Sequence, residues 1–203
     1  MRRGPLLLLA ALLPRMAAAQ ADSGRPVSGS AQFYVQLAEG EAPLPVGIVG
    51  VDARSWHFEG RYNYEDIDTG SLWVGWNLST GSTVRLDLTP MAALVVGTVD
   101  GVAPGLEVTL SWKNLTFYDE AEVVIPFSGD PAYFVSWSST TWWFSDLLQP
   151  GITVQRFRVF EGEREVDWGL ALASEFGRLS TGVYAFAPFG ASPFWQLSAE
   201  WAF

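Results

Sequence analysis

Ten ionisable side chains fall on the polar faces of short alternating stretches, where they could interact with one another. They are His57, Glu59, Arg61, Arg85, Asp87, Glu107, Glu120, Glu122, Arg156 and Arg158. Carboxylates and guanidinium groups that are held together away from water form charge-assisted hydrogen bonds, and an imidazole beside carboxylates can bind or transfer a proton. The residue types therefore predict a salt-bridged charge network, and they make His57 a weak candidate for a catalytic group.

The elements that must position these side chains are β-strands. From residue 51 onward, apolar and polar residues alternate in short runs that turn residues separate. In the first run, for example, Trp56 and Phe58 oppose His57 and Glu59. The predicted strands cover residues 55–64, 71–79, 84–96, 106–112, 115–125, 133–144, 152–161, 166–172, 179–187 and 192–203.

Two of these strands contain irregular positions. Pro90 cannot donate a ladder hydrogen bond, so a bulge is expected near it. Arg156 and Arg158 share the parity of Ile152 and Val154, so they join the polar face only if a bulge or a mixed register changes their side. The strand at 133–144 is expected to place Ser136, Ser138 and Thr140 on the polar face.

The N-terminal residues M-R-R-G-P-L-L-L-L-A-A-L-L-P-R-M-A-A-A-Q-A are typical of a secretory signal peptide. Residues 1–21 are therefore expected to be removed on export. The loss of Arg2, Arg3 and Arg15 takes the formal net charge from -10 to -13. Residues 22–50 are interpreted as a periplasmic lead-in or small plug, in which 28–37 can form a short strand.

Composition excludes several classes of protein. The chain has no cysteine, so neither disulfides nor a thiolate site can form. It is acidic and has no basic run, which excludes a nucleic-acid partner. Charged residues make up 17% of the chain against a usual value of about 25%. No hydrolase, phosphate-loop or zinc motif occurs, so the chain is expected to carry no cofactor and no metal.

The last stretch, S-P-F-W-Q-L-S-A-E-W-A-F, places Trp195, Leu197 and Trp201 on one face and ends with Phe203. This pattern resembles the C-terminal signature of small Gram-negative outer-membrane β-barrel proteins, in which Trp201 and Phe203 would form the assembly signal. The resemblance implies an outer-membrane location, contact with outer-membrane lipid and recognition by the barrel-assembly machinery. The chain is expected to be a monomer.

The predicted fold is all-β: an antiparallel, up-and-down transmembrane barrel of residues 51–203 with about ten strands, or alternatively eight. Tracing the strands up and down places aromatic side chains in two belts, as the two membrane interfaces select. One belt contains Trp56, Trp112, Trp143 and Trp201, and the other contains Tyr62, Tyr64, Tyr133, Trp168 and Trp195.

Three classes of function follow from this fold. The first is a structural barrel or narrow passive channel with a salt-bridged polar lumen and no enzymatic activity; an excess of acids also leaves a cation-selective pore or a calcium site open. The second is a lipid-modifying or proteolytic barrel enzyme, which would need Ser and acid groups near His57 at an open rim. The third is a soluble periplasmic lipocalin-like binder, in which Trp76, Leu110 and Leu197 would point inward.

Overall fold

The regular structure of this protein is β-strand throughout the part of the chain that the computed structural model describes. That part comprises residues 27–203 except 146, 161, 163 and 191. Within it, no helix has the length and apolar character needed to cross a bilayer. The predicted signal peptide at 1–21 lies outside the described residues.

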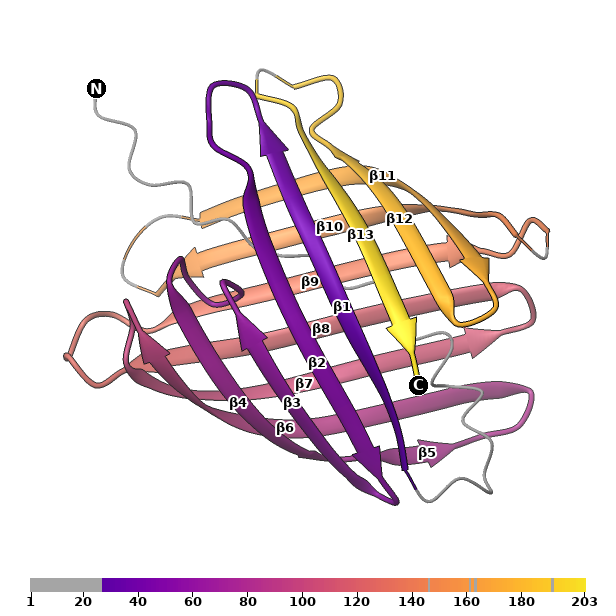
Figure 1. The fold of residues 1–203 in the computed structure, drawn as a ribbon, viewed down its shortest axis with the longest axis horizontal. Helices are drawn as coiled ribbons and strands as arrows, with labels where there is room; N and C mark the ends of the chain where they lie inside the picture. The colour runs from indigo at the N-terminus through magenta and orange to yellow at the C-terminus, as the bar shows by residue number, and fades with distance from the viewer. Residues whose placement is uncertain (1–26, 146, 161, 163, 191) are drawn as a thin grey trace.

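The strands follow one another through short turns and loops (Figure 1). They are β1 (Val27–Ala38), β2 (Leu44–Ala53), β3 (Trp56–Tyr62), β4 (Thr69–Trp76), β5 (Leu78–Thr80), β6 (Val84–Gly97), β7 (Gly101–Trp112), β8 (Leu115–Pro126), β9 (Tyr133–Trp142), β10 (Gln149–Val159), β11 (Arg164–Phe176), β12 (Leu179–Phe186) and β13 (Phe194–Ala202).

Antiparallel pairing joins these strands into one closed sheet. Sequence neighbours pair along the chain, β1 pairs with β13, and β4 pairs with β6. In Figure 1 the front wall, which includes β1, β2 and β13, crosses over the strands of the back wall. Because β4 and β5 lie end to end along β6, they occupy one position, and the barrel has twelve strands.

The prediction of ten strands, with eight as the alternative, is therefore wrong. The two additional strands are β1 and β2, which occupy most of the region interpreted as a lead-in or plug. β1 pairs with β13 from Ser30↔Ala202 to Ala38↔Phe194 and so closes the barrel. Pro45, Gly47 and Gly50 of β2 weaken the alternation that identified the later strands.

The two expected irregularities are absent from these strands. Pro90 stays in register with Leu106 of β7, and on its other side the ladder is interrupted where β4 ends and β5 begins. β10 keeps a constant register with both β9 and β11. Without a bulge, Arg156 and Arg158 remain on the outer face with Ile152 and Val154.

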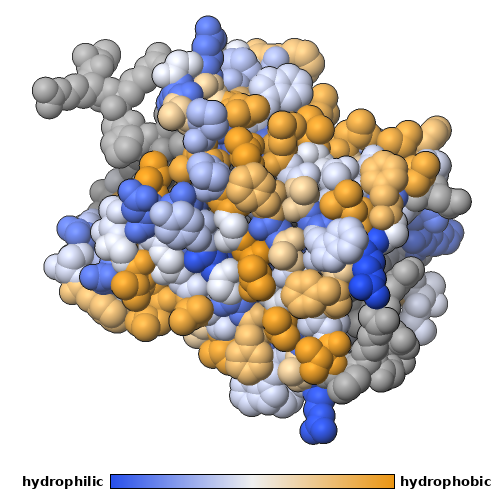
Figure 2. Space-filling view, viewed as in Figure 1, coloured by the Kyte–Doolittle hydropathy of each residue, from blue (hydrophilic) through white to orange (hydrophobic). Residues whose placement is uncertain are grey.

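Apolar side chains point outward from the barrel and most ionisable ones point inward. Phe58 is 47% exposed and Trp201 is 52% exposed, whereas Glu120 is 1% exposed. Figure 2 shows one face of this wall, on which apolar side chains cover much of the surface. Trp76, Leu110 and Leu197 also point outward, which excludes the soluble lipocalin-like alternative, because such a binder buries its apolar face.

The interior of the barrel is packed as well as polar. Trp137 of β9 is fully buried and contacts the rings of Tyr184 and Phe186 edge-on, with centroids 5.3 and 5.2 Å apart. Phe186 stacks on Phe194 at 4.6 Å. In β9 the face that carries Trp137 is therefore turned inward. The prediction that Ser136, Ser138 and Thr140 line the polar interior is wrong, because all three have the opposite parity to Trp137.

The aromatic belts are placed only in part as expected. Trp56, Trp112 and Trp201 point outward at the end of the barrel where β1 begins and β13 ends, and Trp143 is half-buried in the turn after β9. Tyr62, Trp168 and Trp195 point outward at the opposite end.

Tyr64 and Tyr133 are buried, so their assignment to the membrane interface is wrong. Tyr64 follows β3 in a loop and its ring lies against the Arg61 guanidinium. Tyr133 begins β9 on the inward face and donates a hydrogen bond to the carbonyl oxygen of Glu65 at 3.3 Å.

Candidate functional site: the charged interior of the barrel

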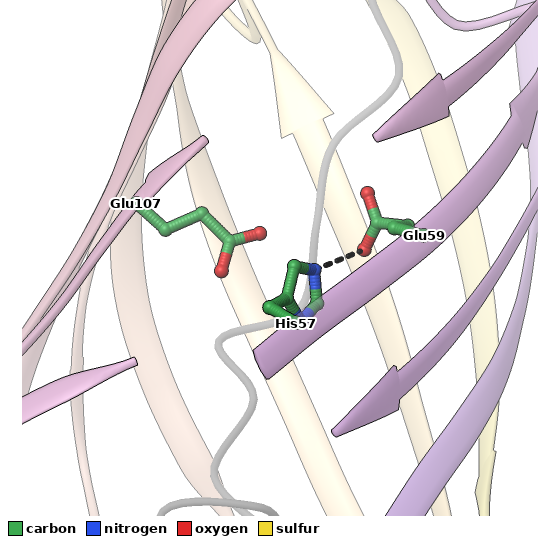
Figure 3. A group of neighbouring side chains, drawn as sticks. All are labelled: His57, Glu59 and Glu107. Atoms are coloured by element: carbon green, nitrogen blue, oxygen red, sulfur yellow. Dashed lines mark ion pairs between the residues drawn. The ribbon is translucent and has the colours of Figure 1, made fainter. Parts of the chain in front are cut away.

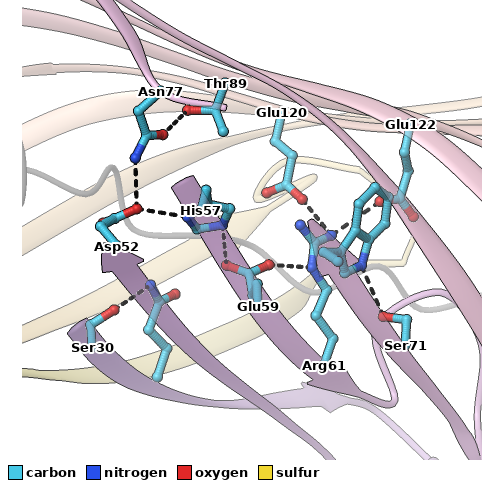
Figure 4. Close-up of polar contacts among 12 residues, drawn as sticks. Ser30, Asp52, His57, Glu59, Arg61, Ser71, Asn77, Thr89, Glu120 and Glu122 are labelled. Atoms are coloured by element: carbon cyan, nitrogen blue, oxygen red, sulfur yellow. Dashed lines mark hydrogen bonds and ion pairs between the residues drawn. The ribbon is translucent and has the colours of Figure 1, made fainter. Parts of the chain in front are cut away.

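Arg61 is the centre of the charge network inside the barrel. Its Nη1 donates to Glu122 at 3.0 Å and pairs with Glu120, and its Nε donates to Glu59 (Figure 4). All four side chains are buried. The guanidinium also lies over the rings of Tyr64 and Trp73, 4.3 and 4.4 Å from their centroids, where cation–π attraction is strengthened by the exclusion of water.

Strand alternation on β3 and β8 presents these residues to one another. Glu59 and Arg61 are two positions apart on the inward face of β3, and Glu120 and Glu122 are two apart on the inward face of β8. Since both strands belong to a closed barrel, their inward faces meet across the interior. Three carboxylates therefore surround a single guanidinium.

A further buried carboxylate, that of Glu65, continues the network toward the end of the barrel where β3 ends and β4 begins. Glu65 accepts a hydrogen bond from Trp73 Nε1 at 3.1 Å and another from the Ser71 hydroxyl. Trp73 Nε1 also lies 2.9 Å from Ser71 Oγ. Neutral donors thus hold Glu65, and they add no positive charge.

His57 lies toward the other end of the network, where β3 begins and β13 ends. Its Nδ1 is 2.8 Å from Asp52 Oδ1, and its Nε2 is 3.7 Å from Glu59 Oε2. Asp52 Oδ1 also accepts from Asn77 Nδ2 at 2.8 Å, and Asn77 Oδ1 accepts from the Thr89 hydroxyl at 2.8 Å. A chain of hydrogen bonds therefore fixes the imidazole (Figure 4).

Glu107 approaches the same imidazole from β7. Figure 3 shows the carboxylates of Glu107 and Glu59 directed toward His57 from two sides. The three side chains are buried, and one ligand atom from each lies within 4.8 Å of the others. His57 is thus enclosed inside the barrel and does not stand at an open rim, where a barrel enzyme would meet its substrate.

The predicted charge network is divided in the structure. His57, Glu59, Arg61, Glu107, Glu120 and Glu122 are brought together. Arg85 and Asp87 form a separate ion pair on β6 at 2.8 Å, with the Arg85 side chain 43% exposed.

Arg156 and Arg158 lie on the outer wall, so their assignment to the interior is wrong. The Arg156 side chain, 40% exposed, donates from Nη1 to Ser138 Oγ at 2.8 Å and to Ser136 Oγ at 3.3 Å. Asp119 Oδ1 lies 4.0 Å from the same nitrogen. We call Asp119, Ser136, Ser138 and Arg156 the outer polar patch.

Sequence analysis missed Asp52, Glu65 and Asn77. Asp52 shares the inward parity of Val46 and Ile48 on β2, a signal that recognition of β2 as a strand would have supplied. Glu65 and Asn77 lie between strands, where alternation gives no information. Their positions depend on contacts that only the closed barrel creates.

Acidic groups predominate in the interior of the barrel. Among the described residues, six buried carboxylates share it with Arg61 and His57; they are those of Glu59, Glu65, Glu107, Glu120, Glu122 and Glu200. Carboxylates that are removed from water need positive charge or donors to remain ionised. In this barrel Arg61 supplies the positive charge, and the side chains of Trp73, Ser71 and Tyr118 supply neutral donors.

Comparison with known proteins gives a fold and no closer relationship. No protein-family model matches the chain, and no curated protein matches it. KdgM porin superposes with a TM-score of 0.64 at 8% identity over 86% of this chain and 99% of that chain. NanC porin superposes with a TM-score of 0.60 at 11% identity over 84% of this chain and 98% of that chain.

The chain has a porin fold. A further structure, KdgM porin in complex with disordered oligogalacturonate, superposes with a TM-score of 0.65 at 8% identity. Together with the apolar outer wall, this porin fold supports the predicted location in the outer membrane.

Proposed function

We propose that this porin-fold barrel is a narrow passive channel of the outer membrane that prefers cations. The observation that carries the proposal is the buried row of carboxylates from Glu65 through Glu122 to Glu107, beside which Arg61 is the only buried guanidinium among the described residues. In a low-dielectric lumen this excess of negative charge lowers the energy of a cation and raises that of an anion.

The packed interior restricts what can pass. Trp137, Tyr184 and Phe186 fill the lumen beside the charged region, and each is almost fully buried. We therefore propose ions and water as the permeating species. Acidic sugars such as the oligogalacturonate bound by KdgM porin would meet both a steric barrier and an electrostatic one in this barrel.

The proposal predicts cation-selective current of low conductance in planar bilayers. Under a KCl gradient the reversal potential is expected to lie closer to the equilibrium potential of K⁺ than to that of Cl⁻. Glu107→Gln is expected to reduce the cation-to-anion permeability ratio several-fold, because it removes one lumen charge. Asp119→Asn removes a carboxylate from the outer wall and should leave the ratio unchanged. An anion-selective wild type would contradict the proposal.

A closed structural barrel is the second candidate, and the aromatic packing around Trp137 favours it. The two candidates differ in the wild-type current. A barrel that is folded by heat-modifiable gel mobility and carries no current, while a variant lacking Trp137 conducts, would establish the closed barrel.

A further inference from the structure

We infer that His57, Glu59 and Glu107 form a binding site for one divalent transition-metal ion inside the barrel. The three side chains come from β3 and β7, are buried, and place their ligand atoms within 4.8 Å of one another (Figure 3). One imidazole and two carboxylates are a ligand set that suits such an ion.

The imidazole is oriented for this role by its second nitrogen. Asp52 Oδ1 lies 2.8 Å from Nδ1, so it can accept the proton of that nitrogen and make Nε2, which is 3.7 Å from Glu59 Oε2, the atom that would bind the ion. Asn77 and Thr89 hold Asp52 in turn. Carboxylates that fix the far nitrogen of a metal-binding histidine are characteristic of metal sites, where they set the tautomer and increase the basicity of the ligand.

The charge distribution is also that of a cation site. The separation of 3.7 Å between His57 Nε2 and Glu59 Oε2 is too long for a hydrogen bond. Two carboxylates beside one imidazole concentrate negative charge at a single place, which favours a bound cation. Arg61 lies on the far side of Glu59, where it pairs with other carboxylates as well.

The geometry needs only a small adjustment to bind an ion. Ligand bonds of about 2.0 to 2.2 Å place neighbouring ligand atoms roughly 3 to 3.5 Å apart. The ligand atoms lie within 4.8 Å of one another, so a bound ion would draw them about 1 to 2 Å closer together. The imidazole selects a transition metal over Ca²⁺ and Mg²⁺, which take oxygen ligands.

The inference is independent of the proposed function, because an ion can be held in this site whether or not the barrel conducts. Retained metal binding in a barrel without current would therefore overturn the channel alone. Cation-selective current without metal binding would overturn the metal site alone.

The experiment uses the full-length folded barrel in detergent micelles after treatment with a chelator. Titration with Co²⁺ is expected to produce visible ligand-field absorption that saturates at one ion per chain, and Zn²⁺ should displace it. His57→Gln and Glu107→Gln should abolish the absorption. Asp52→Asn should weaken binding about 10-fold to 100-fold, as the loss of a supporting carboxylate does at other histidine sites.

Asp119→Asn is the matched control, since it removes a carboxylate from the outer wall and should bind Co²⁺ as the wild type does. Heat-modifiable gel mobility reports whether each variant folds. The inference fails if the wild type gives no Co²⁺ absorption at millimolar concentration, if folded His57→Gln binds equally well, or if Ca²⁺ competes as effectively as Zn²⁺.

Discussion

Replacing Arg61 with Leu is expected to lower the free energy of unfolding by about 3 to 5 kcal/mol, the usual cost of removing one partner from a buried ionic network. The substitution leaves Glu59, Glu120 and Glu122 facing one another without the guanidinium that they share. Urea unfolding in lipid vesicles, followed by tryptophan fluorescence, measures the loss, and heat-modifiable gel mobility measures the folded fraction.

Arg85→Leu is the control for this effect. Arg85 also pairs with a carboxylate, but its side chain is 43% exposed, so the expected loss is within about 1 kcal/mol. Adding Glu120→Gln to Arg61→Leu should restore part of the stability, because the amide carries no charge. Equal losses from the two arginine variants would refute a central role for Arg61.

Replacing Trp137 with Ala should destabilise the barrel by about 3 to 5 kcal/mol and, in the proposed channel, increase its conductance. The indole is fully buried and packs on Tyr184 and Phe186, so its removal leaves a cavity in the lumen. The same urea measurement gives the stability, and planar-bilayer recordings give the conductance.

Trp142→Ala is the control that tests whether the effect of Trp137→Ala on conductance depends on the side chain lying inside the barrel. Trp142 lies on the same strand but points outward and is 58% exposed. Its loss should leave the conductance unchanged and cost less stability than that of Trp137. A larger conductance in Trp142→Ala than in Trp137→Ala would contradict the assignment of the lumen.

Sequence predicted the antiparallel barrel because alternation is strong where one face meets apolar surroundings and the other does not. In β3, for example, Phe58 points outward and both His57 and Glu59 point inward, as expected. The signal weakens in β2, where Gly47 and Gly50 interrupt it. It misleads in β9, because Trp137 fills the interior and serines occupy the outer face.

For the charge network, the sequence predicted only which residues of one strand share a face. Parity placed Glu59 with Arg61 and Glu120 with Glu122, but which pairs meet depends on the closure and register of the whole barrel. The pairing of Asp52 with His57 joins β2 to β3 and could not be predicted, because Asp52 lay between the predicted plug, which ended at residue 50, and the first predicted strand. Arg156 was misplaced because charge was given more weight than parity.

The outer polar patch interrupts the apolar outer wall of the barrel on one side. The apolar surface that faces acyl chains is therefore shorter there than on the rest of the circumference. On the side of β8, β9 and β10, Asp119 and Arg156 stand where acyl chains would otherwise meet apolar side chains. A bilayer adapts to such hydrophobic mismatch by thinning locally or by letting the protein tilt, at a modest cost per ångström. We therefore expect the barrel axis to be inclined to the membrane normal, with the thinnest bilayer beside Arg156.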